Sequence, residues 1–382
     1  MTDSEHTTDL SAEGRLLREF LTLAHIDSPP RREGQIMRVL APQLTALGLR
    51  VHFDEAHLAV DGQVGNLIAT LPATRPSAPP IFLSAHVDTV ASTAGIKTIV
   101  SDGVVRTDGS TILGADDKSA VAAILEALRH IVSYEIPHGE VQILFSICEE
   151  IGLKGAAAMD LSLVKAKTGF VFDSSLPVGG IVTRSPSHDR IKAVIHGRKA
   201  HAGMRPEAGV SAIEIAAHAV SRMKLGRIDH ESTANIGVIH GGEATNIVAD
   251  RVEIEAEARS LDEVKLRSQV QSMTDALAAA AAERGGHADV NVSRHYSHFS
   301  IDETAPVLRL AREAIQAIGL TPRIGVSGGG SDASIFNARG LSSVVLGIGY
   351  RDIHTHQESM EVAELVRIYK LAVALIERAA EA

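Results

Sequence analysis

Acidic residues and histidines gather at five places along the chain, close to the ends of apolar runs or at the start of a helical stretch. They stand in SAHVDTV (His86, Asp88), GADDKSA (Asp116, Asp117), SICEE (Glu149, Glu150), GFVFD (Asp173) and RDIHTH (His354, His356). Imidazole and carboxylate ligands with almost no thiolate suit a catalytic Zn²⁺ site, and Co²⁺ or Mn²⁺ can use the same ligands. Two such ions with a bridging carboxylate would activate a water and polarise a carbonyl.

Each of these places also has a simpler explanation. An Asp at a helix start is usually a cap, and Glu149-Glu150 alone reads as an exposed turn. A phosphate-binding loop is excluded, because three residues (115–117) separate Gly114 from Lys118, where the motif needs the Lys directly after the Gly. Five apolar runs that all lead to an acid or a histidine are hard to explain by capping alone, so metal binding is the hypothesis we pursue.

The elements that must position these residues alternate along the chain. Short, mainly apolar runs alternate with helical stretches, as in PPIFLSAH, VQILFSICEE, TGFVFDSS and SSVVLGIG. This pattern predicts an α/β fold with a central mixed, largely parallel sheet between helices. Ligands bind at the carboxyl edge of such sheets, which is where the acids and histidines fall.

The middle of the chain has a different pattern. Its later strands alternate polar and apolar residues, as in RVEIEAEARS, which is typical of a sheet with one face in water. We predict an inserted α+β domain of two helices on a four-stranded sheet at 189–298. The catalytic domain then comprises 1–188 and 299–382.

Composition narrows the class of protein. The chain has 382 residues, 45% of them apolar, and a formal charge of −10, which argues against a broad nucleic-acid-binding face. Aromatic residues make up 3%, too few for base stacking. We see no membrane-spanning run and no signal peptide, and the single Cys148 excludes an internal disulfide. We therefore expect a cytoplasmic location.

With these motifs in view, the sequence resembles the co-catalytic zinc exopeptidases of the peptidase T, carboxypeptidase G and aminoacylase family. The landmarks run from His86 to Glu358: SAHVDTV, GADDKSAVA, CEEIGLKGA, FDSS, GRKAHAG, EATNIV, GGGSDAS and IHTHQES. GADDK with EEIGLKGA is most similar to the peptidase T branch, the tripeptide aminopeptidases. The resemblance implies two metal ions, a short peptide substrate and a homodimer formed through the inserted lid domain.

The resemblance also implies a ligand set. His86 and Asp173 would bind one ion, Glu150 and His354 the other, and Asp116 would bridge them. It implies a cis peptide bond after Asp116. The chain departs from the family pattern at His356, where the family often has a residue other than histidine. Either histidine could reach the metal, and the H-T-x-x-E pattern favours His354.

Other residues would act on the substrate. Glu149 would be the general base, and Asp88 would orient His86 by accepting its second ring N–H. In the inserted domain, His201 would stabilise the oxyanion, while the substrate would be held by Asn246, Arg259, Gly329 and Ser331. Without the resemblance, His201 and Arg259 read as exposed polar residues, and the glycine-rich loop as a strand-to-helix turn.

The sequence leaves more than one function open. The leading hypothesis is a tripeptide aminopeptidase, and an N-acyl amino acid amidohydrolase or a carboxypeptidase of the same family is the alternative. A non-catalytic peptide-binding protein is disfavoured, because Glu149 is present and would be needed only for turnover.

Overall fold

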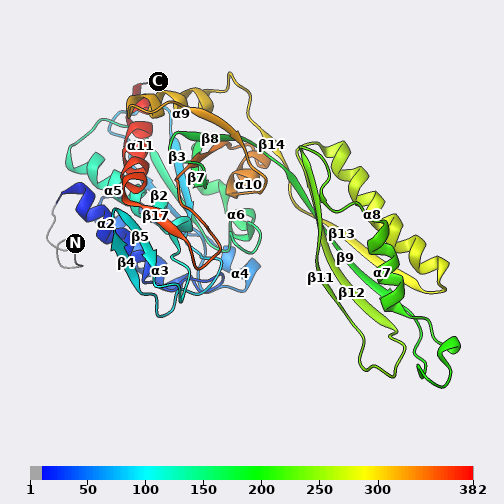
Figure 1. Cartoon of the computed structure of the whole chain (residues 1–382). Coiled ribbons are helices and arrows are strands. Elements are labelled where there is room, and N and C mark those ends of the chain that lie inside the picture. Colours follow the sequence, from blue (N-terminus) through cyan, green and yellow to red (C-terminus); the bar gives the residue numbers. More distant parts are fainter. Residues whose placement is uncertain (1–10, 382) are drawn as a thin grey trace. The chain divides into compact units, whose positions relative to one another are not determined.

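A computed structural model describes residues 11–381, which form two compact units (Figure 1). The first unit takes in the chain up to Thr183, then Ser300–Val326 and the chain from Ser331 on. The second comprises Arg184–Phe299 and the short segment Ser327–Gly330. The predicted domain boundaries at 189 and 298 did not include this glycine-rich segment, which the sequence pattern does not link to the inserted stretch.

A nine-stranded sheet forms the centre of the first unit. Its strands, in spatial order, are β1 (Arg50–Phe53), β2 (Leu67–Leu71), β6 (Val141–Ser146), β3 (Ile81–His86), β7 (Thr168–Ser174), β16 (Ser342–Gly347), β8 (Gly180–Ser185) and β14 (Phe299–Ser300), and β15 (Arg323–Val326) pairs with β8. The four central strands β6, β3, β7 and β16 run parallel, while β1, β2 and β8 pair antiparallel. The predicted α/β fold with a mixed, largely parallel sheet is confirmed.

Helices cover this sheet and bury its apolar strands. They are α2 (Ala12–Ala24), α3 (Gly34–Ala46), α4 (Ala56–Val60), α5 (Ala115–Ser133), α6 (Lys154–Ala158), α9 (Pro306–Ala317), α10 (Asp332–Ala338) and α11 (Val362–Glu381), with a 3₁₀ turn at Leu161–Leu163. All six residues of β3 and of β6 are buried, which explains why both strands are apolar at most positions. A small sheet of β4 (Thr98–Ser101), β5 (Val104–Thr107) and β17 (Ser359–Glu361) completes the unit.

The first helix shows how local sequence sets these elements. The Ser11 hydroxyl accepts a hydrogen bond from the Gly14 amide at 3.1 Å and so caps α2. Its apolar stripe, which includes Leu16, Leu17 and Phe20, is buried against the core. Among the described residues, no helix combines the length and the apolar character needed to cross a membrane.

The second unit is a five-stranded antiparallel sheet with two helices. Its strands, in spatial order, are β10 (Gly226–Arg227), β11 (Ser232–Gly241), β12 (Arg251–Ser260), β9 (Ser187–His196) and β13 (His287–Tyr296). The helices are α7 (Ala212–Arg222) and α8 (Glu263–Glu283), and Pro206–Ala208 forms a 3₁₀ turn. The two-residue β10 was not predicted, because so short a strand leaves no sequence pattern.

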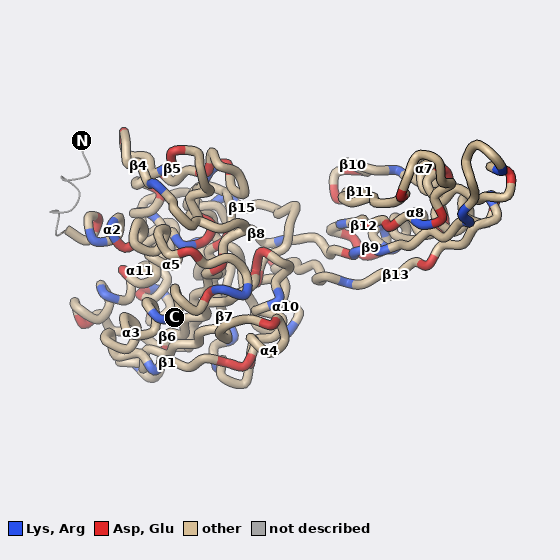
Figure 2. Tube along the Cα trace, turned by 90° about the horizontal axis from the view of Figure 1, so that it is seen from below, with Lys and Arg blue, Asp and Glu red and all other residues tan. Residues whose placement is uncertain are grey.

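One face of this second sheet carries the helices and the other carries charged side chains. Ile191, Val252 and Ile254 pack with Leu266 in its core. Acidic and basic residues are interspersed along the strands of the unit (Figure 2). This explains the alternation of polar and apolar residues that marked the segment in the sequence.

Candidate metal centre

The last residue of β3 contributes the first histidine of the centre. His86 is buried, and its Nε2 lies 3.1 Å from Oδ1 of Asp116. Its other ring nitrogen, Nδ1, lies 2.9 Å from the backbone carbonyl oxygen of Asp88 and 3.6 Å from the carboxylate of that residue. The acceptor is therefore the Asp88 carbonyl rather than the expected carboxylate. A ring held in this way leaves Nε2 facing Asp116.

The Asp88 carboxylate has a different set of partners. It accepts hydrogen bonds from the backbone amides of Glu149 and Glu150, at 3.0 and 3.1 Å. Because both its oxygens bind these amides, Asp88 links the end of β3 to the loop after β6. That loop places the Glu149 and Glu150 side chains at the same edge of the sheet.

Asp116 and Asp117 lie in the first turn of α5 with backbone angles outside the helical range, and the peptide bond between them is cis, as the resemblance implied. The Glu358 carboxylate, far away in sequence, accepts hydrogen bonds from the amides of Leu113, Gly114 and Asp116 at 2.8 to 3.0 Å. These bonds fix the turn that presents Asp116. The role of Glu358 could not be read from the sequence beyond its place in the H-T-x-x-E pattern.

The loop after β16 brings the second histidine. His354 Nε2 lies 3.3 Å from Asp116 Oδ2 and 3.2 Å from Glu150 Oε2. His356 instead points its Nδ1 at the backbone carbonyl of Gly109, 3.0 Å away. The geometry thus brings His354, and not His356, to the predicted ligands.

Asp173, at the end of β7, is linked to the same loop. Its Oδ1 accepts a hydrogen bond from the Tyr350 hydroxyl at 3.1 Å. Tyr350 is buried in the loop after β16, and it was not singled out from the sequence. Burial, and next the charge of Asp116, raise the pKa of Asp173 well above its usual range.

These residues form a group suited to a cation. Ligand atoms of His86, Asp116 and Glu150 lie within 4.8 Å of one another, and His354 contacts two of the three. Oε1 of Glu150 is buried without a hydrogen-bond partner among the described residues, as expected of an oxygen that a metal ion would bind. The donor set and this free oxygen fit a bound divalent ion.

The electrostatics of the metal-free protein point the same way. Burial raises the pKa of Glu149 and of Asp117, and for Glu149 the nearby Asp173 adds to the effect. Burial opposes the charge of His86, yet its contacts with Asp116 and Asp88 raise its pKa well above the usual range. Several carboxylates therefore repel one another in a space from which water is largely excluded, and a cation would relieve that repulsion.

The second unit holds four of the predicted substrate residues. His201 is exposed and forms an isolated β-bridge with Ile247, while the Ala202 amide donates to the Asn246 carbonyl at 2.9 Å, so that the backbones of His201 and Asn246 run side by side. The Arg259 guanidinium binds the Glu257 carboxylate through Nε and Nη2, at 3.0 Å each.

Gly329 also belongs to this second unit. A Cβ added to Gly329 would lie 3.6 Å from Nη1 of Arg259, and the Ser185 hydroxyl donates to its carbonyl at 2.9 Å. Ser331 belongs to the first unit, where its hydroxyl is buried without a hydrogen-bond partner among the described residues. Arg259 and Gly329 thus lie together in the second unit, and Ser331 lies in the first.

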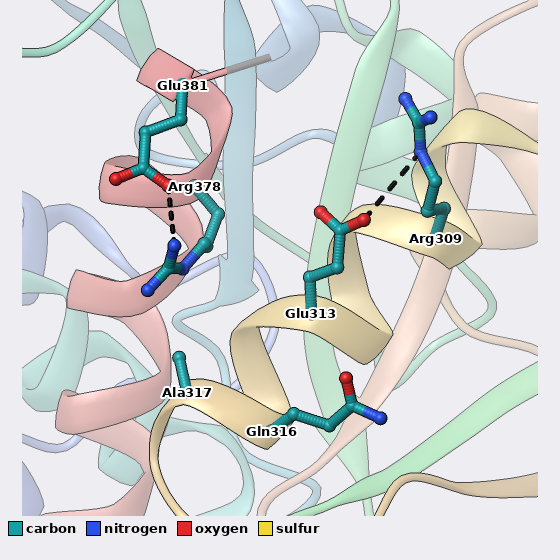
Figure 3. Close-up of a pocket in the computed structure, with 6 residues that line it drawn as sticks. All are labelled: Arg309, Glu313, Gln316, Ala317, Arg378 and Glu381. Carbon is teal, nitrogen blue, oxygen red and sulfur yellow. Dashed lines mark hydrogen bonds and ion pairs between the residues drawn. The ribbon is translucent and has the colours of Figure 1, made fainter.

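A polar hollow of the first unit contains none of these residues. It measures about 560 Å³ and lies between α9 and α11 (Figure 3). Its lining comprises Arg309, Glu313, Gln316, Ala317, Arg378 and Glu381. Each arginine pairs with a glutamate of its own helix, so the charges are balanced and the hollow offers no chemistry comparable to that of the metal centre.

Comparison with known proteins places the chain in a family. The model of peptidase family M20/M25/M40 matches residues 82–378, which include every residue of the candidate centre. The chain belongs to this family. It is a metallopeptidase by that membership, and the resemblance inferred from the motifs is confirmed.

Individual relatives agree with this assignment. A solved tripeptidase from Staphylococcus aureus is 44% identical, covers 97% of this chain and 99% of its own, and superposes with a TM-score of 0.93. The aminopeptidase PepT from Bacillus cereus is also 44% identical, with 96% and 99% covered and a TM-score of 0.88. Peptidase T from Geobacillus thermodenitrificans is 25% identical over 91% of this chain and 92% of its own.

Proposed function

We propose that this peptidase removes the N-terminal residue from tripeptides and uses two divalent metal ions, most simply Zn²⁺, to do so. The observation that carries the proposal is the meeting of His86, Asp116, Glu150 and His354 at one edge of the sheet, next to the half-buried Glu149. The similarity to a tripeptidase and to the aminopeptidase PepT, each at 44% identity, supports the substrate class.

The ligands divide between two ions in this proposal. His86 and Asp173 hold one, Glu150 and His354 hold the other, and Asp116 has an oxygen toward each histidine, which suits a bridging carboxylate. When bound, a pair of ions polarises the scissile carbonyl and lowers the pKa of a water molecule. Asp88 acts indirectly, because its carbonyl orients His86 and its carboxylate holds the amides of Glu149 and Glu150.

Glu149 is the proposed general base. Its carboxylate takes a proton from the attacking water and later gives it to the amine of the leaving peptide. Burial raises its pKa in the metal-free protein, and nearby bound cations would lower that pKa, so that the carboxylate is ready to accept a proton. The carboxylate ends each cycle deprotonated, as it began.

The second unit supplies most of the proposed substrate contacts, and the first unit supplies Ser331. We assign His201 to the oxyanion and Asn246, Arg259, Gly329 and Ser331 to the peptide chain. Arg259 keeps its Nη1 toward Gly329 while Glu257 holds the opposite edge of the guanidinium. The inserted domain, predicted at 189–298, is proposed as the lid and as the surface of a homodimer, and the location as cytoplasmic.

One experiment separates the proposed activity from its alternatives. The zinc-loaded protein is incubated with tripeptides of three different residues, each offered with a free and with an acetylated amine, and the products are identified by mass spectrometry. We expect loss of the first residue from the free-amine set alone. Turnover of only the acetylated set would indicate a deacylase, and loss of the last residue would indicate a carboxypeptidase.

A further inference from the structure

The loop that carries Glu149 and Glu150 has a backbone that needs outside support. Cys148 has a φ of +52°, in the left-handed region that a residue with a side chain rarely adopts. The Glu149 carbonyl then accepts two hydrogen bonds, from the amides of Gly152 and Leu153 at 2.8 and 2.7 Å. The position of the proposed base thus depends on a tight, locally unfavourable turn.

Two buried carboxylates hold three consecutive amides of this turn. Asp88 accepts from Glu149 and Glu150, as described above. Glu33 Oε1 accepts from the Cys148 amide at 3.1 Å and lies 3.3 Å from the Cys148 thiol. One acid comes from the end of β3, and the other comes from the residue that precedes α3. Together the two carboxylates fix the backbone of Cys148, Glu149 and Glu150.

Glu33 is an unfavourable choice for a residue with only a packing role. It is fully buried, and burial raises its pKa, with the charge of Asp88 adding to the effect. Its Oε1 takes a third hydrogen bond from the Arg31 amide at 2.9 Å, while Oε2 has no partner among the described residues. A buried carboxyl group that is only partly hydrogen-bonded costs stability, so its contact with Cys148 needs a reason beyond packing.

We propose that Glu33 is a positioning residue for the general base, because it fixes the Cys148 amide and thereby the direction in which Glu149 leaves the loop. This inference rests on the proposed peptidase activity. Glu33 touches no reacting atom, so it acts only through the loop. Its loss should therefore move Glu149 away from the attacking water and leave substrate contacts in place.

The test uses three variants of the full chain. Glu33→Gln keeps an oxygen that can accept all three hydrogen bonds, Glu33→Asp draws the carboxylate back by one methylene, and Glu33→Ala removes it. A misplacement of about 1 Å can lower turnover by about 100-fold. We expect Glu33→Ala to lose about 10- to 100-fold in kcat with KM changed less than about threefold. Glu33→Gln should stay within about fivefold of the original kcat, and Glu33→Asp should fall between the two.

A matched control separates this effect from lost stability. Glu126 is likewise a fully buried carboxylate, and it pairs with Arg15 of α2 and with Arg129 of its own helix, α5. Glu126→Gln should lower the melting temperature without lowering kcat. Metal content of every variant is measured at the same time.

The outcomes are distinct. A wild-type protein that cleaves no tripeptide refutes the proposed function itself. If the wild type is active, then an unchanged kcat in Glu33→Ala, or a loss in Glu33→Gln as large as in Glu33→Ala, overturns the positioning role. If Glu33→Ala does not fold, kcat is compared between Glu33→Asp and Glu33→Gln instead. A kcat of Glu33→Asp that is no lower than that of Glu33→Gln then overturns the positioning role.

Discussion

Replacing either histidine of the IHTH stretch by alanine should have unequal effects on metal binding. His354 Nε2 lies within 3.3 Å of Asp116 and Glu150, whereas His356 contacts the carbonyl of Gly109. We expect His354→Ala to weaken metal binding about 100-fold or more, and His356→Ala to leave it nearly unchanged. The two variants are matched, since each removes one exposed imidazole from the same loop.

The expected change in melting temperature follows from the affinity for zinc and from the size of the first unit. A ligand present at about 1,000 times its Kd stabilises the folded state by about 4 kcal/mol, and at about 10 times its Kd by about 1.4 kcal/mol. The first unit has about 260 residues, which corresponds to an unfolding entropy of about 0.55 kcal/mol per kelvin. Added Zn²⁺ should therefore raise the melting temperature of the original protein by about 7 °C and that of His354→Ala by about 3 °C.

The assay is calorimetry of each protein after chelator treatment, with and without a fixed zinc concentration, together with metal analysis. A zinc-induced shift in His356→Ala smaller than that in His354→Ala would refute the assignment and make His356 the ligand. No shift in the original protein would refute the metal centre as a whole.

Two further predictions concern the proposed base Glu149 and the proton that His354 loses when zinc binds. Glu149→Gln should keep its metal content and lose about 10²- to 10⁴-fold in kcat, and turnover in the original range would remove Glu149 from the base role. In the metal-free protein, hydrogen bonds to Asp116 and then Glu150 raise the pKa of His354 to about 10, from about 6.5 in an unfolded chain. The charged His354 therefore stabilises the metal-free fold fully below about pH 6.5, and this contribution is lost as the pH rises toward 10. Zinc binding at pH 8 should accordingly release a proton, which calorimetry in two buffers of different ionisation heat would detect, and zinc binding without proton release would contradict it.

The central elements were predictable because their patterns are local. β3 and β6 are each apolar at four of their six positions, and the cap at Ser11 starts α2. His86 and Glu150 end apolar runs, so the topology of a parallel sheet was enough to bring them to one edge.

Other features depend on contacts that no local pattern records. Glu33, Tyr350 and Glu358 act through hydrogen bonds to residues more than 100 positions away along the chain. The same limit explains why the carbonyl of Asp88 was not foreseen as the partner of His86, since the choice between its two kinds of oxygen depends on where the loop after β6 lies.

The order of strands in the first sheet means that this sheet can be completed only late in the synthesis of the chain. β7 lies between β3 and β16, but β16 is made only after the whole of Arg184–Phe299 has left the ribosome. Until then the nascent chain carries an open parallel edge with the apolar residues Phe170, Val171 and Phe172. Open apolar edges promote aggregation of partly made chains. A chain whose synthesis ends before Ser342 should therefore aggregate, even though it already contains most of the proposed metal ligands.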